Sequence, residues 1–288
     1  MSLAKKQVQE LTVEEIYQKK DQKEHVLDEP DTYIGSVEVH EDYQWVIDEN
    51  FGTQNNLDNS SLGSLSEILS SNGDEVSNEP LAEQEPEQEK GETRMVMKKI
   101  KYVPGLYKIY DEVLVNAIDH WTRMNEKIRQ QKLIREGKME ETPEITLSMK
   151  FKPVKNIWVE IDQVNNRISV TNDGDGIPVD WHKTCQVYVP ELIFSQFLTS
   201  GNYKGKSKNS ENFNQTKIIG GKNGFGAKLA AAFSTEFTIE TVDANNKQKY
   251  VQTFRDNLDN IEQPVIVDVA ASEAPYTKIT FCPEFWFQ

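Results

Sequence analysis

The chain has 288 residues and a net charge of −15, which suggests one large domain or two small ones without the basic surface typical of nucleic-acid binding. Its two cysteines form no Cys-x-x-Cys pair and its four histidines do not cluster with them, which argues against a zinc site. No stretch approaches the ~18 apolar residues of a membrane span, and the N-terminus has no apolar signal core. We therefore expect a soluble, intracellular protein without a membrane partner.

Much of the negative charge lies in one segment. Residues 51–92 contain ten acidic residues and one lysine, with many serines, asparagines and glutamines. Because this composition buries too little apolar surface to offset its ordering entropy, we predict a disordered insert over 51–93. The insert divides an N-terminal arm, 1–50, from a folded domain, 94–288, and we expect the arm and the domain to form one unit.

Short elements flank the insert. Residues 11–25 are predicted to form a helix, and Pro30 and Gly35 indicate a turn. Strand-like alternation follows at 43–48, and again at 94–103 after the insert.

A long helix is predicted next, over 104–133. Apolar residues recur along it at spacings of three and four. They are Leu106, Tyr110, Val113, Leu114, Ala117 and Trp121.

Strands and two short helices alternate in the remainder of the chain. The predicted helices are 189–198 and 225–234, and a hairpin is predicted between 156–162 and 167–173. The other predicted strands are 145–152, 236–243, 247–255, 265–269 and 276–283. Helices interleaved with an antiparallel run of strands indicate an α+β fold in two layers.

The long helix carries a polar stripe formed by Glu112, Asn116 and Asp119. An exposed face is one interpretation. However, asparagine is a poor helix former, and the three residues contain no pair of opposite charges. A carboxylate beside an amide oxygen would suit a hydrated Mg²⁺, and a second carboxylate could orient or deprotonate a water molecule.

Two glycine-containing stretches have both a structural and a functional interpretation. "NDGDGIP" at 172–178 follows a strand and is either an ordinary turn or a place where another backbone or a ligand approaches closely. "GGKNGFGAKLA" at 220–230 leads into a helix and is either a turn or an anion-binding loop. It matches neither a Walker A motif nor a convincing dinucleotide fingerprint.

In this order and at these spacings, the three features resemble the GHKL, or Bergerat, ATPase domain shared by gyrase, the heat-shock chaperone, histidine kinases and MutL. Longer strings narrow the resemblance: "EHVLDEPDTYIGSVE", "YVPGLYKIYDEVLVNAIDH", "FLTSGNY" and "GGKNGFGAKLAAAFSTEF". They are similar to the N-terminal ATPase region of eukaryotic-type, type IIA DNA topoisomerase II. This resemblance implies a two-layer α/β sandwich whose mixed, mostly antiparallel sheet is covered by helices on one face.

The resemblance also implies roles for individual residues. Glu112 would be the general base for the water that attacks the γ-phosphate, and Asn116 would bind Mg²⁺. Asn172 and Thr277 would recognise adenine, and Tyr33 lies on a segment that in this family crosses to the partner subunit. The other residues implied to contact ATP are Asp119, His120, Ile177, Thr199, Ser200, Gly201, Asn202, Lys222, Asn223, Gly224, Phe225, Gly226, Ala227 and Lys228.

Four of these positions depart from the usual family pattern. His120 stands where the family often has Asn, Gly201 where it usually has a second Ser, Lys222 where it has Arg, and Phe225 where it has Tyr. The lysine keeps the charge but loses the bidentate fork of arginine. The lysine-bearing stretch 204–217 before the loop is a candidate mobile lid.

In the family, ATP binding dimerises two such domains into a gate that captures a DNA duplex. The resemblance thus implies ATP and Mg²⁺ as cofactors, a second copy of the chain as partner, and double-stranded DNA as partner of the full-length enzyme. A nuclear or viral replication-site location would follow.

Family members continue into a transducer domain whose lysine reaches the γ-phosphate. This sequence does not include that part, so we expect ATP binding with slow hydrolysis. The alternatives are another GHKL-type ATP switch, MutL-like or chaperone-like, and a non-catalytic nucleotide sensor.

Overall fold

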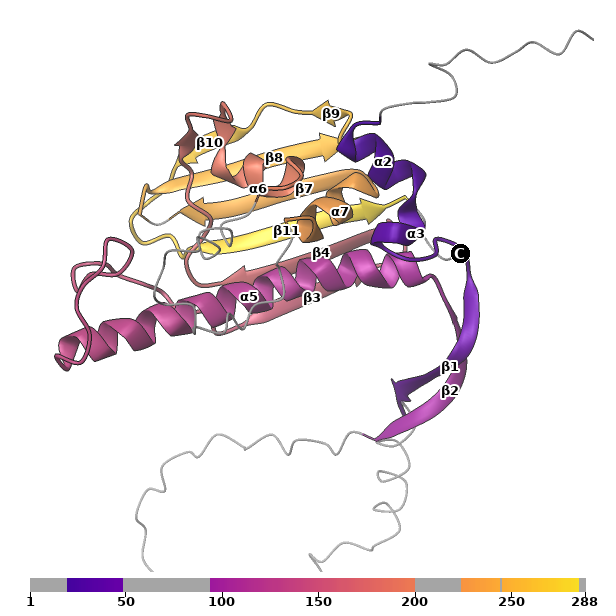
Figure 1. The fold of residues 1–288 in the computed structure, drawn as a ribbon, viewed down its shortest axis with the longest axis horizontal. Coiled ribbons are helices and arrows are strands. Elements are labelled where there is room, and N and C mark those ends of the chain that lie inside the picture. Colours follow the sequence, from indigo (N-terminus) through magenta and orange to yellow (C-terminus); the bar gives the residue numbers. More distant parts are fainter. Residues whose placement is uncertain (1–19, 49–93, 200–223, 244, 285–288) are drawn as a thin grey trace, which may run out of the picture. The chain divides into compact units, whose positions relative to one another are not determined.

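A computed structural model of the chain describes residues 20–48, 94–199, 224–243 and 245–284 (Figure 1). The chain divides into two compact units: His40–Tyr102 forms one, and the segments before and after it form the other. The predicted insert and the predicted lid lie outside the described residues. The predicted division at 50/51 and 93/94 stays a prediction.

The smaller unit contains one antiparallel strand pair. Strand β1 (His40–Ile47) pairs with β2 (Met95–Tyr102), from His40 opposite Tyr102 to Ile47 opposite Met95. Both strands were predicted from their alternation.

The larger unit is built on a seven-stranded sheet in the order β10-β8-β7-β11-β4-β3, with β9 paired to β8. All of these pairings are antiparallel. The strands are β3 (Ile157–Asp162), β4 (Arg167–Asp173), β7 (Ser234–Asp243), β8 (Gln248–Arg255), β9 (Asn260–Ile261), β10 (Val265–Asp268) and β11 (Tyr276–Pro283). A separate short pair joins β5 (Trp181–His182) to β6 (Val187–Tyr188). The predicted hairpin and the four predicted C-terminal strands are confirmed.

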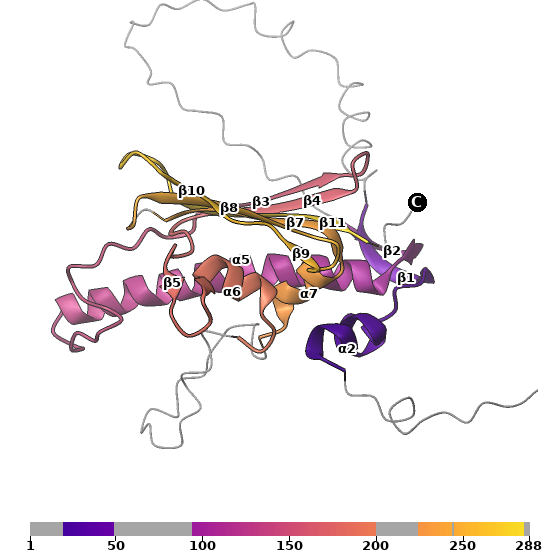
Figure 2. The same ribbon diagram turned by 90° about the horizontal axis from the view of Figure 1, so that it is seen from above.

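Helices cover one face of this sheet, as Figure 2 shows. They are α2 (Gln22–Asp28), α3 (Pro30–Tyr33), α5 (Pro104–Arg135), α6 (Val189–Ser195) and α7 (Gly226–Ala232). The two-layer α+β fold with a mostly antiparallel sheet is thus confirmed; every pairing among the described strands is antiparallel. No helix among the described residues combines the length and apolar character that crossing a membrane requires.

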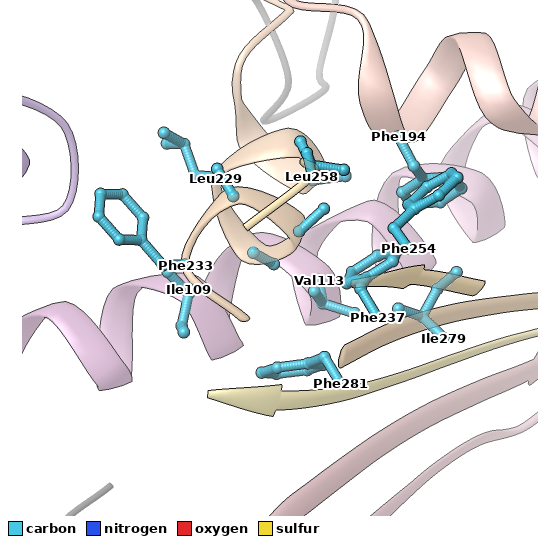
Figure 3. Close-up of a cluster of buried hydrophobic side chains, with 14 of the residues drawn as sticks. Ile109, Val113, Phe194, Leu229, Phe233, Phe237, Phe254, Leu258, Ile279 and Phe281 are labelled. Atoms are coloured by element: carbon cyan, nitrogen blue, oxygen red, sulfur yellow. The ribbon is translucent and has the colours of Figure 1, made fainter. Parts of the chain in front are cut away.

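Aromatic side chains between the sheet and the helices form the centre of the core (Figure 3). Phe237 on β7 lies between Phe254 on β8 and Phe281 on β11, with ring centroids 6.1 and 6.4 Å away. Phe194 of α6 packs on Phe237 at 5.6 Å. Because strand side chains alternate between faces, these strands bury every second residue under the helices.

The buried face of α5 differs from the predicted one. Ile109 and Met124 are fully buried, whereas Trp121 is 48% exposed. The prediction used apolar residues alone and so missed part of the buried face of α5. That part contains polar residues that line a cavity, for example His120.

The strand predicted at 145–152 is absent; the only pairing there is an isolated bridge between Thr142 and Ile145. The carbonyl groups of Thr146 and Met149 instead accept hydrogen bonds from the Gln131 side chain on α5, at 2.7 and 2.8 Å. A helix side chain therefore binds two carbonyl groups of this segment that a neighbouring strand would otherwise have to pair.

Helix boundaries also differ. Residues 11–19 of the helix predicted at 11–25 lie outside the described residues. Within the described part, α2 begins at Gln22, because Asp21 is its N-cap and accepts from the Glu24 amide at 2.8 Å. The helix predicted at 189–198 ends at Ser195. The helix predicted at 225–234 ends at Ala232, and β7 begins two residues later.

Candidate functional site

A cavity of about 310 Å³ lies between α5 and the sheet. Helix α5 contributes Asn116 and His120, and the sheet contributes Asn172 and Thr277. The segment after β4 contributes Ile177. These five residues, predicted from distant parts of the sequence, therefore share one cavity.

The sheet side of the cavity carries a pair of polar side chains. Asn172 on β4 and Thr277 on β11 are directly opposite each other in the strand register, and their exposed fractions are 5% and 9%. The Asn172 Nδ2 donates a hydrogen bond to the Asp173 carbonyl oxygen at 2.8 Å. Its Oδ1 is thus left as an acceptor for a donor group on a ligand.

The "NDGDGIP" segment is tightly packed on neighbouring backbone. A Cβ added to Gly176 would lie 2.0 Å from the Val242 carbonyl oxygen, and one added to Gly174 would lie 3.0 Å from the Val154 nitrogen. Gly174 also has a φ of +91°. Of the two interpretations made from the sequence, close approach of another backbone is therefore correct at both glycines.

Glu112 lies one helical turn before Asn116 but does not line the cavity. Lys108 holds its carboxylate in an ion pair at 2.5 Å, and the Asn116 side chain donates to its backbone carbonyl. A Cβ on Gly226 would lie 2.3 Å from Glu112 Oε2. The carboxylate thus faces the first turn of α7, where the glycine-rich loop ends.

The start of α7 packs against α3 and against the segment after α6. Gly224 has a φ of +72°, and Phe225 follows as the N-cap. The Phe225 ring packs between Tyr33 of α3, at 5.6 Å, and Phe197, at 5.8 Å. Tyr33, predicted to lie on a segment that crosses to a partner, contacts this loop within its own chain.

Two further predicted residues on α7 are buried. Ala227 belongs to the hydrophobic core. Lys228 is only 4% exposed, and its Nζ donates to the Thr199 carbonyl oxygen at 3.0 Å. Burial lowers the pKa of Lys228 to about 8.

His120 has a fixed hydrogen bond in the cavity wall. Its Nε2 lies 2.6 Å from the Asp175 carbonyl oxygen, which can only accept, so Nε2 carries the proton. Burial, helped by the nearby Arg123 charge, lowers the pKa of His120 to about 4. The ring is therefore neutral near pH 7.

Asp119 is buried and lies outside the cavity lining. Its charge acts on Arg123, whose pKa is lowered by burial and raised by Asp119. Besides Asn172 and Thr277, the residues Arg123, Lys127 and Asp175 also line the cavity. The sequence pattern did not single out these three, because only the tertiary fold brings them together.

Five predicted residues, Ser200, Gly201, Asn202, Lys222 and Asn223, lie outside the described residues. Among the residues that are described, no group of three or more His, Cys, Asp or Glu side chains could hold a metal. Asn116 could take part in a site with fewer protein ligands: its Nδ2 donates to the Glu112 carbonyl, which leaves its Oδ1 available as an oxygen ligand, and the residue lines the cavity. Mg²⁺ suits such a site when water and substrate phosphates supply the other ligands.

Comparison with known proteins defines the class. Residues 102–262, more than half of the chain, match the family model "Histidine kinase-, DNA gyrase B-, and HSP90-like ATPase". The chain belongs to this ATPase family.

Within the family, the chain is similar to DNA topoisomerase 2. It is 39% identical over 274 residues to DNA topoisomerase 2 of Acanthamoeba polyphaga mimivirus and 37% identical over 273 residues to that of Plasmodium falciparum. Each alignment covers 95% of this chain but only 16% and 14% of the relative, so the chain spans about a sixth of their length.

Solved structures agree with this similarity. The ATPase region of Saccharomyces cerevisiae topoisomerase II matches with a TM-score of 0.62 and 36% identity, over 93% of this chain and 51% of that chain. The ATPase and transducer domains of DNA topoisomerase II from Balamuthia mandrillaris match with a TM-score of 0.65 and 36% identity, over 96% and 51%.

Proposed function

We propose that the chain is the ATP-binding and ATP-hydrolysing gate domain of a type IIA DNA topoisomerase. The observation that carries this proposal is the alignment of two features along α5. Asn116 lines the cavity that contains Asn172 and Thr277, and Glu112, one turn earlier, faces the glycine-rich start of α7. A nucleotide with its base at Asn172 and Thr277 could therefore direct its phosphates toward Glu112.

Glu112 would act as the general base. Its carboxylate would accept a proton from a water molecule as that water attacks the γ-phosphorus and the bond to the β-phosphate oxygen breaks. Lys108 would hold the carboxylate in place, and Gly226 leaves room for it. Asn116 would hold Mg²⁺, which neutralises phosphate charge when bound.

The remaining residues would bind and position the nucleotide. The backbone N–H groups at Gly226 and Ala227 begin α7 and are not used within the helix, so they can face phosphate oxygens. Lys228 adds a positive charge on the same turn. As in the resemblance described above, ATP would close two copies of the domain around double-stranded DNA in the full-length enzyme, and the chain alone would hydrolyse ATP slowly.

Isothermal titration of the chain with Mg²⁺ and a non-hydrolysable ATP analogue tests the binding step. We expect one nucleotide per chain. Glu112→Gln should keep the affinity within about threefold but lower phosphate release by about 10²-fold or more, because a general base contributes roughly 10² to 10⁴. Lys132→Gln, an exposed change on the same helix, is the control. A wild-type chain that binds no nucleotide, or a Glu112→Gln variant with undiminished hydrolysis, would overturn the proposal.

A further inference from the structure

Thr241 lies behind the cavity, outside its lining. It is on β7, its exposed fraction is 0%, and its register partner on β11 is Thr277. Its hydroxyl oxygen makes three contacts of hydrogen-bond length: with the Ile177 nitrogen at 2.9 Å, the Tyr276 carbonyl oxygen at 2.9 Å and Thr277 Oγ1 at 3.1 Å.

The direction of each of these hydrogen bonds follows from counting protons. A hydroxyl has one proton to donate and two lone pairs. The Tyr276 carbonyl oxygen can only accept, so it takes the proton of Thr241. The Ile177 amide can only donate, so Thr241 accepts there. Thr241 has then no proton left for Thr277, and the Thr277 hydroxyl must donate to Thr241.

This direction decides what Thr277 offers the cavity. Its proton points to Thr241, so only oxygen lone pairs remain for a ligand. Asn172, directly opposite on β4, has its Nδ2 hydrogen-bonded to Asp173 and its Oδ1 left as an acceptor. Thr277 therefore presents only lone pairs to the cavity, and Asn172 presents its Oδ1 beside it. This pair of acceptors matches a ligand amino group, whereas a ligand carbonyl would face the lone pairs of Thr277.

We propose that Thr241 is a positioning residue that sets the base selectivity of the site. By taking the Thr277 proton it makes the wall favour a 6-aminopurine over a 6-oxopurine. This inference rests on the proposed function, since it requires a purine nucleotide in the cavity.

Thr241 also holds the cavity wall. Its bond to the Ile177 amide anchors the segment that follows Gly176, whose Cα approaches Thr241 so closely that a Cβ would lie 2.8 Å from its Oγ1. Loss of the hydroxyl would thus lower stability as well as selectivity. A useful test needs a readout that stability alone does not change.

The ratio of ADP affinity to IDP affinity is such a readout, because the two nucleotides differ in the 6-amino and 6-oxo groups of the base. We expect the wild-type chain to prefer ADP. In Thr241→Val, the Thr277 hydroxyl has lost its acceptor and can donate to the 6-oxo group, so the ratio should fall by about tenfold, as expected for one rearranged hydrogen bond. Thr241→Ser, which keeps the hydroxyl, should retain the wild-type ratio.

Thr238→Val is a matched control on the same strand. Its hydroxyl bonds to Thr253 Oγ1 at 3.0 Å, and neither residue lines the cavity. This variant should lose stability without a change in the ratio. If Thr241→Val does not fold, Thr241→Cys replaces it, because a thiol is a poor acceptor and should also lower the ratio.

The outcomes separate the two proposals. A folded Thr241→Val or Thr241→Cys variant that binds ADP with the wild-type ratio overturns the role of Thr241 and leaves the proposed function intact. A fall in the ratio for Thr238→Val as well would also overturn it, since the effect would then be a general one. A wild-type chain that binds neither nucleotide overturns both.

Discussion

An added Cβ would meet different atoms at Gly226 and at Gly176. We therefore expect substitution of the first glycine to affect activity and substitution of the second to affect stability. At Gly226 the added Cβ would meet Glu112 Oε2, the movable end of a side chain. At Gly176 it would meet the Val242 carbonyl oxygen, which is part of the β7 backbone. The Glu112 side chain can change its rotamer, whereas the Val242 carbonyl group is fixed by strand pairing.

We therefore predict that Gly226→Ala keeps the wild-type melting temperature within a few degrees but loses most ATP hydrolysis, because Glu112 is displaced. Gly176→Ala makes the same chemical change and should lower the free energy of unfolding by about 1–3 kcal/mol, the usual cost of overpacking. Urea denaturation and phosphate release measure the two effects. Normal hydrolysis by Gly226→Ala would show that Glu112 does not work from this position.

Lys228 combines a functional charge with a cost in stability. Its pKa in the folded chain is about 8, below the 10.5 of an exposed lysine, so the unfolded chain holds the proton more tightly between these values. The cost of burying the charge, about 3 kcal/mol at most, is therefore complete below pH 8 and declines as the pH rises toward 10.5.

Lys228→Met should consequently raise the melting temperature at pH 7 and remove the gain in stability that wild type shows between pH 8 and 10.5. The same variant should bind the ATP analogue more weakly, because the cation beside the α7 start is gone. Thermal melts over this pH range and titration with the analogue check both. A less stable variant at pH 7 would contradict the assigned cost of burial.

Among elements, the end of β7 holds part of the cavity wall through Asp243. Asp243 is buried and accepts from the Val179 amide at 2.9 Å and from the Asn245 amide at 2.9 Å. It thus ties the segment after "NDGDGIP" to the end of β7, and Asn245 itself lines the cavity.

Asp243→Ala would leave these amides without their acceptor, at about 1–3 kcal/mol for the buried Val179 amide. We predict faster hydrogen exchange at the Val179 amide and weaker nucleotide binding, with little change in β3 at the far edge of the sheet. Exchange followed by mass spectrometry or NMR provides the measurement. An unchanged exchange rate of the Val179 amide in this variant would contradict the role of Asp243 in holding the segment after "NDGDGIP".

The elements also show how far sequence reasoning reached. Alternation identified the hairpin of β3 and β4 and the C-terminal strands, because one face of each strand packs on the core. The same alternation failed at 145–152, where no strand forms and a glutamine of α5 binds two of the carbonyl groups. The family resemblance implied that Asn116, Asn172 and Thr277 share one site, but Thr241 has no local signal, since its contacts come from two strands and a loop that meet only in the fold.

For the whole molecule, the main prediction concerns turnover. The chain spans about a sixth of the length of DNA topoisomerase 2 from mimivirus. Within the described residues the cation paired with Glu112 is Lys108, on its own helix, and Lys228 is hydrogen-bonded to Thr199. We predict an ATPase turnover below about 0.1 per second, under the roughly 1 to 1000 per second typical of enzymes. A coupled phosphate-release assay tests this, and Glu112→Gln sets its background. A rate within the typical range would mean that the described residues suffice for catalysis.

The most direct test of the central claim is a crystal structure of the chain with Mg²⁺ and a non-hydrolysable ATP analogue. The account predicts the adenine amino group within hydrogen-bond distance of Asn172, and the γ-phosphate beside Glu112 and the start of α7. Nucleotide density outside the cavity between α5 and the sheet, or a base turned away from Asn172 and Thr277, would contradict it.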